Sequence, residues 1–168
     1  MPLKGDYNFQ NIARKKLKEG KSFSVNARWE IPADTEQGLA ITTNGGTLEL
    51  VSIVAYTEAE DCLIYIIEGP DSYDELANEL NLTDNNRKTK NDSVFDAKLA
   101  ENITNGINLG PNFYLDVEQT VSGRTIIGGY TAAVKPLILD SETIYIIAFG
   151  NQSVDNPTMV NIAVELFE

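Results

Sequence analysis

Along most of this chain apolar residues alternate with polar ones, and this period of two limits the fold more than any other feature of the sequence. In residues 22–30 the alternation places four apolar side chains on one face: Phe23, Val25, Ala27 and Trp29. A strand with one face in a core has this pattern. The same reasoning predicts strands at 38–43, 47–56, 62–68, 93–99, 113–118, 136–139, 143–149 and 159–167. About nine short strands separated by turn residues predict an all-β fold, an antiparallel β-sandwich of jelly-roll-like type.

Turn signals between these strands predict how the chain connects them. Asn44-Gly45 lies between two apolar runs and predicts a hairpin, because both central positions of a type I′ turn need a positive φ. Gly69-Pro70 is predicted to end the strand before it, since proline cannot continue a ladder. The segment 71–80 is predicted to form a helical turn or a loop, and the Asn- and Gly-rich segment 102–110 a loop.

The first twenty residues have a different periodicity. Apolar residues recur there at helical spacing: Phe9, Ile12, Ala13 and Leu17. Asn8 is a predicted N-cap and Gly20 a predicted stop. An isolated helix of this length is marginal in water, so it must dock either on its own body or on a partner. We therefore expect a short helical arm over residues 1–20 and a β-sandwich domain over residues 21–168.

Charge divides the chain at the same place. Against a net charge of -12 for the whole chain, residues 1–20 carry +3 and the remaining residues carry -15. A body this acidic repels phosphates, so we expect no binding of nucleic acid through it. The lysines of the basic arm either contact an acidic surface or only keep the surface of a short helix hydrated.

The apolar runs of the chain are too short to cross a membrane. The strongest two, 62–67 and 144–149, span six residues each, whereas a transmembrane helix needs about 20. The residues that follow Met1 also lack the apolar region of a signal peptide. We expect a soluble protein with no membrane partner.

The composition removes several kinds of active site. The chain has no histidine, so it can build neither a Ser-His-Asp nor a Cys-His nucleophile and no His-ligated metal. Its one cysteine, Cys62, begins an apolar strand and is expected to be an inert buried thiol. The acidic clusters at 58–61 and 71–75 are interpreted as solvated surface. Glycosidase chemistry would need two carboxylates that face each other across a sugar, and closeness in sequence does not show such a pair. We expect no catalytic residues, no cofactor and no metal.

Several short motifs follow one another in a specific order from residue 20 onward. They are Gly-Lys-Ser-Phe (20–23), Tyr-Ile-Ile-Glu-Gly-Pro (65–70), Asn-Asn-Arg (85–87), Leu-Ile-Leu (137–139), Tyr-Ile-Ile (145–147), Gly-Asn (150–151) and Glu-Leu-Phe-Glu (165–168). In this order the chain resembles a family of small tailed-bacteriophage virion proteins, the capsid decoration or head-associated β-sandwich type. At 85–87 the chain departs from that pattern, which more often reads Asn-Arg-Asn-Arg.

The resemblance implies a structural role without catalysis. It implies a capsid decoration protein that is made in the host cytoplasm, is located on the capsid surface of the virion, binds the major capsid protein and forms a homotrimer. The charge division and the marginal helix suggest residues 1–20 as the arm that faces the capsid. The candidate contact residues are then Phe9, Ile12, Arg14, Lys15, Lys16 and Leu17, with Arg87 either in a salt bridge to a subunit or capsid, or an ordinary solvated charge.

The sequence is also compatible with two other classes of function. A head-fibre or tail-associated jelly-roll module would recognise host carbohydrate or a receptor through exposed aromatic residues, for which Tyr73 and Tyr130 are candidates. A glycan hydrolase would need a carboxylate pair in a cleft. The lack of histidine and the short loops weigh against the enzyme.

Overall fold

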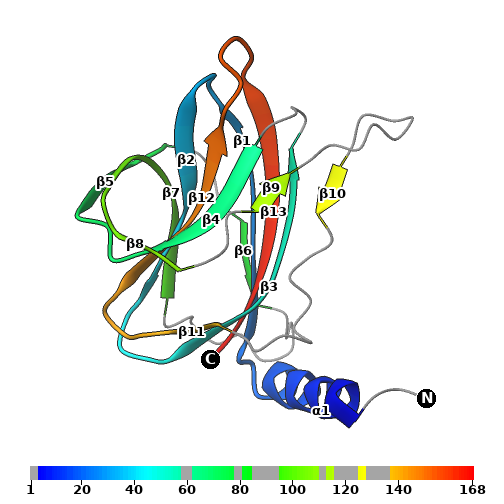
Figure 1. Ribbon diagram of the computed structural model, residues 1–168. Coiled ribbons are helices and arrows are strands. Elements are labelled where there is room, and N and C mark those ends of the chain that lie inside the picture. The colour runs from blue at the N-terminus through cyan, green and yellow to red at the C-terminus, as the bar shows by residue number, and fades with distance from the viewer. Residues whose placement is uncertain are drawn as a thin grey trace.

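The computed structural model shows two antiparallel β-sheets packed face to face, with one helix, α1 (Lys4–Lys18), at one end (Figure 1). This is the all-β sandwich that the alternating pattern predicts. The structure describes residues 4–57, 62–77, 81–84, 95–109, 113–115, 125–127 and 137–168.

The first sheet, sheet A, has the strand order β10-β3-β13-β1-β6, with β11 also paired to β3. Its central pair joins the first and last long strands of the chain in a register of ten residue pairs, from Ser22 opposite Phe167 to Ile31 opposite Thr158. The strands of sheet A are β1 (Ser22–Ile31), β3 (Leu48–Thr57), β6 (Asn81–Asp84), β10 (Thr125–Ile127), β11 (Leu137–Leu139) and β13 (Thr158–Phe167).

The second sheet, sheet B, has the order β5-β7-β2-β12-β4-β8, with β9 also paired to β4. Its strands are β2 (Thr35–Thr43), β4 (Cys62–Glu68), β5 (Ser72–Glu75), β7 (Phe95–Thr104), β8 (Ile107–Asn108), β9 (Phe113–Leu115) and β12 (Ile144–Asn151). Consecutive long strands alternate between the sheets, because β1 and β3 lie in sheet A while β2 and β4 lie in sheet B.

The core lies between the sheets and is made by the inward-facing residues of the alternating strands. Phe23 of β1 meets Phe95 of β7 edge to face at 5.6 Å, and Trp29 meets Phe149 in the same way at 5.6 Å. Such edge-to-face pairs contribute about 0.5–1.5 kcal/mol each beyond their buried area. The aromatic residues of β1 are therefore core residues, as the sequence predicts.

A second apolar cluster covers the outer side of sheet B. Its buried members are Ala40, Ile67, Ala100, Ile146 and Ala148. Tyr73 of β5 and Ile103 of β7 pack against it, and Figure 1 shows the β5–β7 region curling over that side of the sheet. Sheet B thus has an apolar cluster on each face, whereas Asn26, Arg28 and Glu30 on the outer face of β1 in sheet A are exposed.

The Asn44-Gly45 turn does not form the hairpin that the sequence predicts. It joins β2 of sheet B to β3 of sheet A, so the strands on its two sides do not pair. Only Gly45 has a positive φ, at 95°, whereas the hairpin turn would need one at both positions. The turn therefore carries the chain from one sheet to the other.

Three other local predictions are also wrong. Helix α1 begins at Lys4, so Asn8 lies inside it and is not its N-cap; an acidic residue, Asp6, occupies the first turn, where the helix dipole favours it. The segment 71–80 contains the strand β5, which forms because β7 lies beside it. The segment 102–110 is not only loop, because β7 continues to Thr104 and β8 follows.

Candidate functional site

Helix α1 is attached to the sandwich at its C-terminal end. Gly20 has φ 68° and its N–H donates to Leu17 O at 3.2 Å, while Lys21 N–H donates to Lys16 O at 2.9 Å. This is a Schellman cap, which confirms the predicted stop at Gly20. The Lys16 ammonium donates to the main-chain oxygen of Glu168, and Glu168 N–H donates to Lys21 O at 3.0 Å. The end of β13 therefore holds the end of the helix in place.

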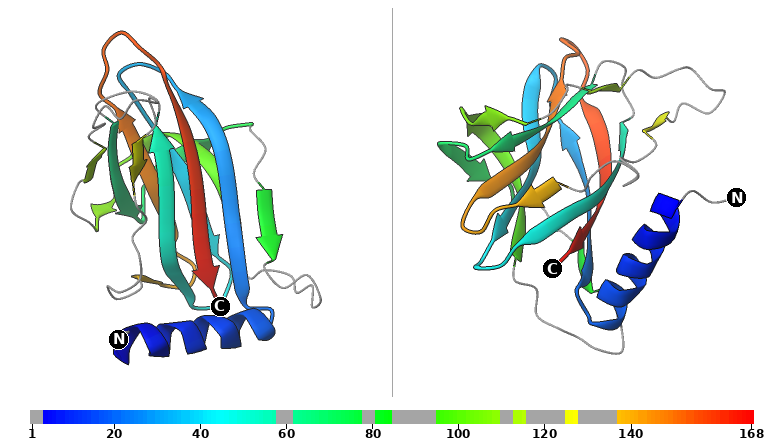
Figure 2. Two further views of the ribbon diagram at one scale, coloured as in Figure 1. Left: turned by 90° about the vertical axis from the view of Figure 1, so that its right-hand side faces the viewer. Right: turned by 60° about the horizontal axis from the view of Figure 1, so that its bottom comes forward.

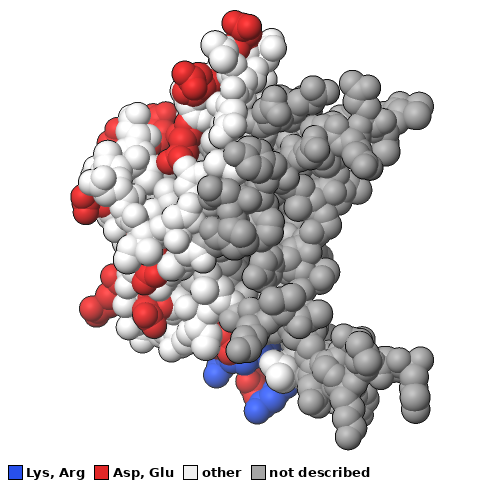
Figure 3. Space-filling model, viewed as in Figure 1, with Lys and Arg blue, Asp and Glu red and all other residues white. Residues whose placement is uncertain are grey.

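The rest of the described part of α1 presents apolar and basic side chains to solvent. Ile12 is 49% exposed and Leu17 is 40% exposed, which is unusual for large apolar residues of a helix that had docked fully. Figure 3 shows basic side chains gathered at the α1 end, while acidic side chains are spread over the visible face of the sandwich. On the face shown, the basic side chains thus lie at the α1 end, apart from most of the acidic ones.

A groove of about 560 Å³ separates α1 from the outer face of sheet A. Figure 2 shows the helix lying across the ends of the strands of this sheet. The groove is lined by Ala13, Arg14, Leu17, Ser22, Ser24, Asn26, Ser52, Val54, Ala163, Val164 and Glu165. One wall is therefore the helix, and the other is a sheet surface of small hydroxyl, amide and apolar side chains.

Among the described residues that line this groove, Glu165 is the one carboxylate. It lies on β13 between Ser24 of β1 and Ser52 of β3, directly opposite each in the strand register. Burial raises the pKa of the Glu165 carboxyl, and the hydrogen bond from Ser52 opposes that rise. The floor of the groove thus holds a half-buried acid that binds a proton more readily than a free glutamate.

We expect Glu165→Gln to raise the thermal unfolding temperature Tm at pH 7. A carboxyl whose folded pKa is raised contributes stability below its unfolded pKa near 4.5 and loses that contribution as the pH rises through the folded pKa. The amide removes this loss, so the gain in Tm should shrink towards zero below pH 4.5. Calorimetry of both proteins between pH 4 and 8 measures this, and a gain that does not change with pH would contradict the assignment.

The acidic cluster at 71–75 forms a set of structural contacts. Each of three carboxylates has a hydrogen-bond partner on β7 or directly after it: Asp71 with Asn105 at 2.6 Å, Asp74 with Asn102 at 2.8 Å, and Glu75 with Lys98 at 2.5 Å. Two of those partners, Asn102 and Asn105, have a positive φ. These carboxylates tie β5 to β7, and no group of three potential metal ligands occurs among the described residues.

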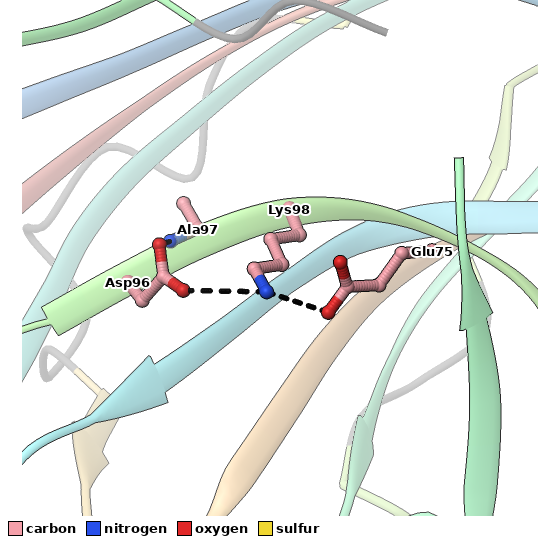
Figure 4. A network of polar contacts seen from close by, with 4 residues as sticks. All are labelled: Glu75, Asp96, Ala97 and Lys98. Carbon is pink, nitrogen blue, oxygen red and sulfur yellow. Dashed lines mark hydrogen bonds and ion pairs between the residues drawn. The ribbon is translucent and has the colours of Figure 1, made fainter. Parts of the chain in front are cut away.

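Lys98 joins two acidic residues at this edge of sheet B. Figure 4 shows its ammonium between Glu75, at 2.5 Å, and Asp96, at 3.8 Å. The hydrogen bond to Glu75 is the main cause of a raised Lys98 pKa. Because all three groups are exposed, this network contributes little to stability.

The predicted contact residues fall on different sides of the helix. Arg14 and Leu17 line the groove, whereas Ile12 and Lys15 point away from it, given the 100° between successive residues. Lys16 is engaged with the end of β13. The side chain of Phe9 and the whole of Arg87, both predicted contacts, lie outside the described residues. Tyr130, a candidate for sugar binding, also lies outside them.

Two residues singled out for chemistry turn out to be packed. Cys62 is buried, and burial raises the pKa of its thiol to about 12, so it is the inert thiol predicted. Tyr73 packs against the outer apolar cluster of sheet B, so it is not the freely exposed aromatic residue that a sugar-binding tip would need.

Sequence reasoning missed the wall of the groove formed by sheet A. Its residues come from β1, β3 and β13, far apart in the chain. The available signal was the run of small polar residues at the outward positions of β1, Ser22, Ser24 and Asn26, since an exposed sheet face usually carries longer charged side chains.

The fold and this groove define a β-sandwich with a basic helical arm. No protein-family model, no curated protein and no solved structure matches the chain. Within the described ranges, none of the helices is both long enough and apolar enough to span a membrane.

Proposed function

We propose that this protein is a non-enzymatic structural component of a bacteriophage virion that decorates the outer capsid lattice. In this proposal it binds the major capsid protein, is located on the capsid surface, and self-associates as a homotrimer. The observation that carries the proposal is the exposed outer side of α1, with Ile12 half in solvent and Lys15 beside it on a helix fixed to the sandwich at one end. The order of motifs in the sequence supports it.

We also propose a jelly-roll topology for the sandwich. The pairing of β1 with β13 in one sheet and of β2 with β12 in the other is what two interleaved Greek keys require. The next strands continue this order, because β3 lies on the other side of β13 and β4 on the other side of β12. Such sandwiches serve as virion building blocks.

The outer side of α1 defines the chemistry of the surface that would bind it. Lys15, which also pairs with Glu19 at 3.9 Å, favours an acidic surface, and the half-exposed Ile12 favours an apolar depression within it. Burying one such side chain contributes about 1.5–3 kcal/mol. A symmetric capsid lattice presents the same surface many times, so the same contact would recur for every bound copy.

The test is the copy number of the protein in purified particles from its source, measured by quantitative mass spectrometry against the major capsid protein. We expect a ratio typical of a lattice component. A second experiment adds the purified protein to particles that lack it. Ile12→Asp should bind these particles about tenfold more weakly or worse than the unchanged protein, because it removes the apolar contact. The control is Ile107→Asp, which changes an isoleucine of β8 that is 65% exposed.

Three outcomes would contradict parts of this proposal. Full occupancy after deletion of residues 1–20 would remove the arm as the capsid contact. A handful of copies per particle would support the alternative, a head-fibre or tail-associated module that recognises host carbohydrate or a receptor. Absence from particles would overturn the virion role altogether.

A further inference from the structure

The end of the sandwich opposite α1 carries a second distinctive surface. It is formed by two connections, residues 32–34 between β1 and β2 and residues 152–157 between β12 and β13, which we call the tip. Figure 1 shows the tip and α1 at opposite ends of the molecule. Because β1 runs from one end to the other over ten residues, roughly 30 Å separate them. The tip of a molecule therefore cannot reach its own groove.

The tip is held in one conformation by a buried side chain. The Asn151 amide nitrogen donates to the carbonyl oxygens of Pro32 at 3.1 Å and Asn156 at 2.8 Å. The Asn151 side-chain oxygen accepts from Ser153 N–H at 3.1 Å, and Asp34 N–H donates to Ser153 O at 2.9 Å. These bonds join the two connections, so little conformational entropy is lost when the tip binds something.

The apex of the tip is apolar and its surroundings are acidic. Val154 is 77% exposed, more than any other large apolar residue that the structure describes. Its neighbour Asp155 is exposed, and Asp34 lies on the adjoining connection. Neither connection contains a lysine or an arginine. The tip thus presents one exposed apolar side chain, Val154, with the acidic residues Asp155 and Asp34 close to it in the two connections.

The groove beside α1 has the complementary features. Ala13, Leu17 and Val54 provide an apolar lining, and the exposed Arg14 provides positive charge on the helix wall. The carboxyl of Glu165 lies half-buried on the floor beside Ser52. A volume of about 560 Å³ is within the range that holds a drug-sized ligand, which suits the apex of a loop.

We propose that the tip of one copy of this protein inserts into the groove of a second copy, with Val154 against Leu17 and Val54 and with Asp155 beside Arg14. The contact is heterologous, because the two surfaces differ and lie at opposite ends of the chain. It closes into a ring, which with three members is the homotrimer proposed above, or it continues as a chain. The contact does not depend on capsid binding, since it uses the inner side of α1.

The test uses the purified full chain and sedimentation velocity at increasing protein concentration. We expect association of the unchanged protein, and weakening by about tenfold or more for Val154→Asp or Leu17→Asp, because each removes the apolar contact. The sharper measurement mixes these two variants. Val154→Asp keeps an intact groove and Leu17→Asp keeps an intact tip. A mixture of the two should therefore form a one-to-one complex although neither variant associates alone.

Two further variants keep the test decisive. Ile107→Asp changes an exposed isoleucine away from both surfaces and should associate as the unchanged protein does. Arg14→Glu alters only an exposed side chain, so it should fold normally and still weaken association. A monomer at all concentrations, unchanged association of Val154→Asp, or a mixture that stays monomeric would each overturn the proposal. None of these results bears on whether the protein binds capsids.

Discussion

Asn151→Ala is expected to lower the free energy of unfolding by about 2–4 kcal/mol. The Asn151 side chain is 2% exposed and donates to main-chain oxygens of Ile31, Pro32 and Asn156. Alanine would leave these acceptors and the Ser153 N–H without their partner, and each unsatisfied buried group costs about 1–3 kcal/mol. Urea denaturation at equilibrium measures the change, with the slope m expected to stay constant.

A matched control lies next to it in the chain. Gln152→Ala changes an exposed side chain of the same loop and should shift the free energy of unfolding by no more than about 0.5 kcal/mol. Equal effects at the two positions would mean that Asn151 does not hold the two connections together. Since the tip depends on this side chain, Asn151→Ala should also weaken the association between copies.

Gly38→Ala is expected to destabilise the protein by about 3 kcal/mol, at the upper end of the cost of overpacking. A β-carbon at Gly38 would lie 2.6 Å from Ile147 O and 3.1 Å from the α-carbon of Ala148, both on the neighbouring strand β12. These are main-chain atoms in the centre of sheet B, so they can move only if the sheet itself deforms. The clash arises from this close approach and does not depend on the φ angle of Gly38.

The control for this prediction is a glycine on the neighbouring strand. At Gly150 of β12 an added β-carbon would meet, among the described residues, only Leu63, at the ordinary distance of 3.8 Å. Gly150→Ala should therefore be neutral, or stabilising by about 0.4–1 kcal/mol because it restricts the unfolded chain. Thermal and urea unfolding of both variants compare them directly, and equal tolerance at the two positions would contradict the packing described for sheet B.

The long strands could be predicted from sequence because each buries an alternating set of side chains. The predicted strand at 62–68 coincides with β4, and that at 22–30 differs from β1 by one residue. The strand β5 could not be predicted in this way, because it has little buried side chain of its own and forms only beside β7. The Asn44-Gly45 turn was predictable from sequence, but the sheet that the chain enters after it was not.

The candidate site could be predicted only in part, for a similar reason. The arm is local in sequence, so its helical spacing, its basic residues and its stop at Gly20 are all visible there. The wall formed by sheet A is not local, since Ser24, Ser52 and Glu165 come together only through strand pairing. Asn151 is another such case, because its partners at Ile31 and Pro32 lie about 120 residues earlier in the chain.

The order of the strands has a consequence for synthesis. In sheet A, β13 lies between β1 and β3, and in sheet B, β12 lies between β2 and β4. The central strand of each sheet thus leaves the ribosome after the strands that flank it. Until β12 and β13 are synthesised, the apolar faces of β1 to β4 lack these partners and are prone to aggregate. Contacts this distant in sequence also form slowly. The sandwich can therefore be completed only after β12 and β13 have been synthesised.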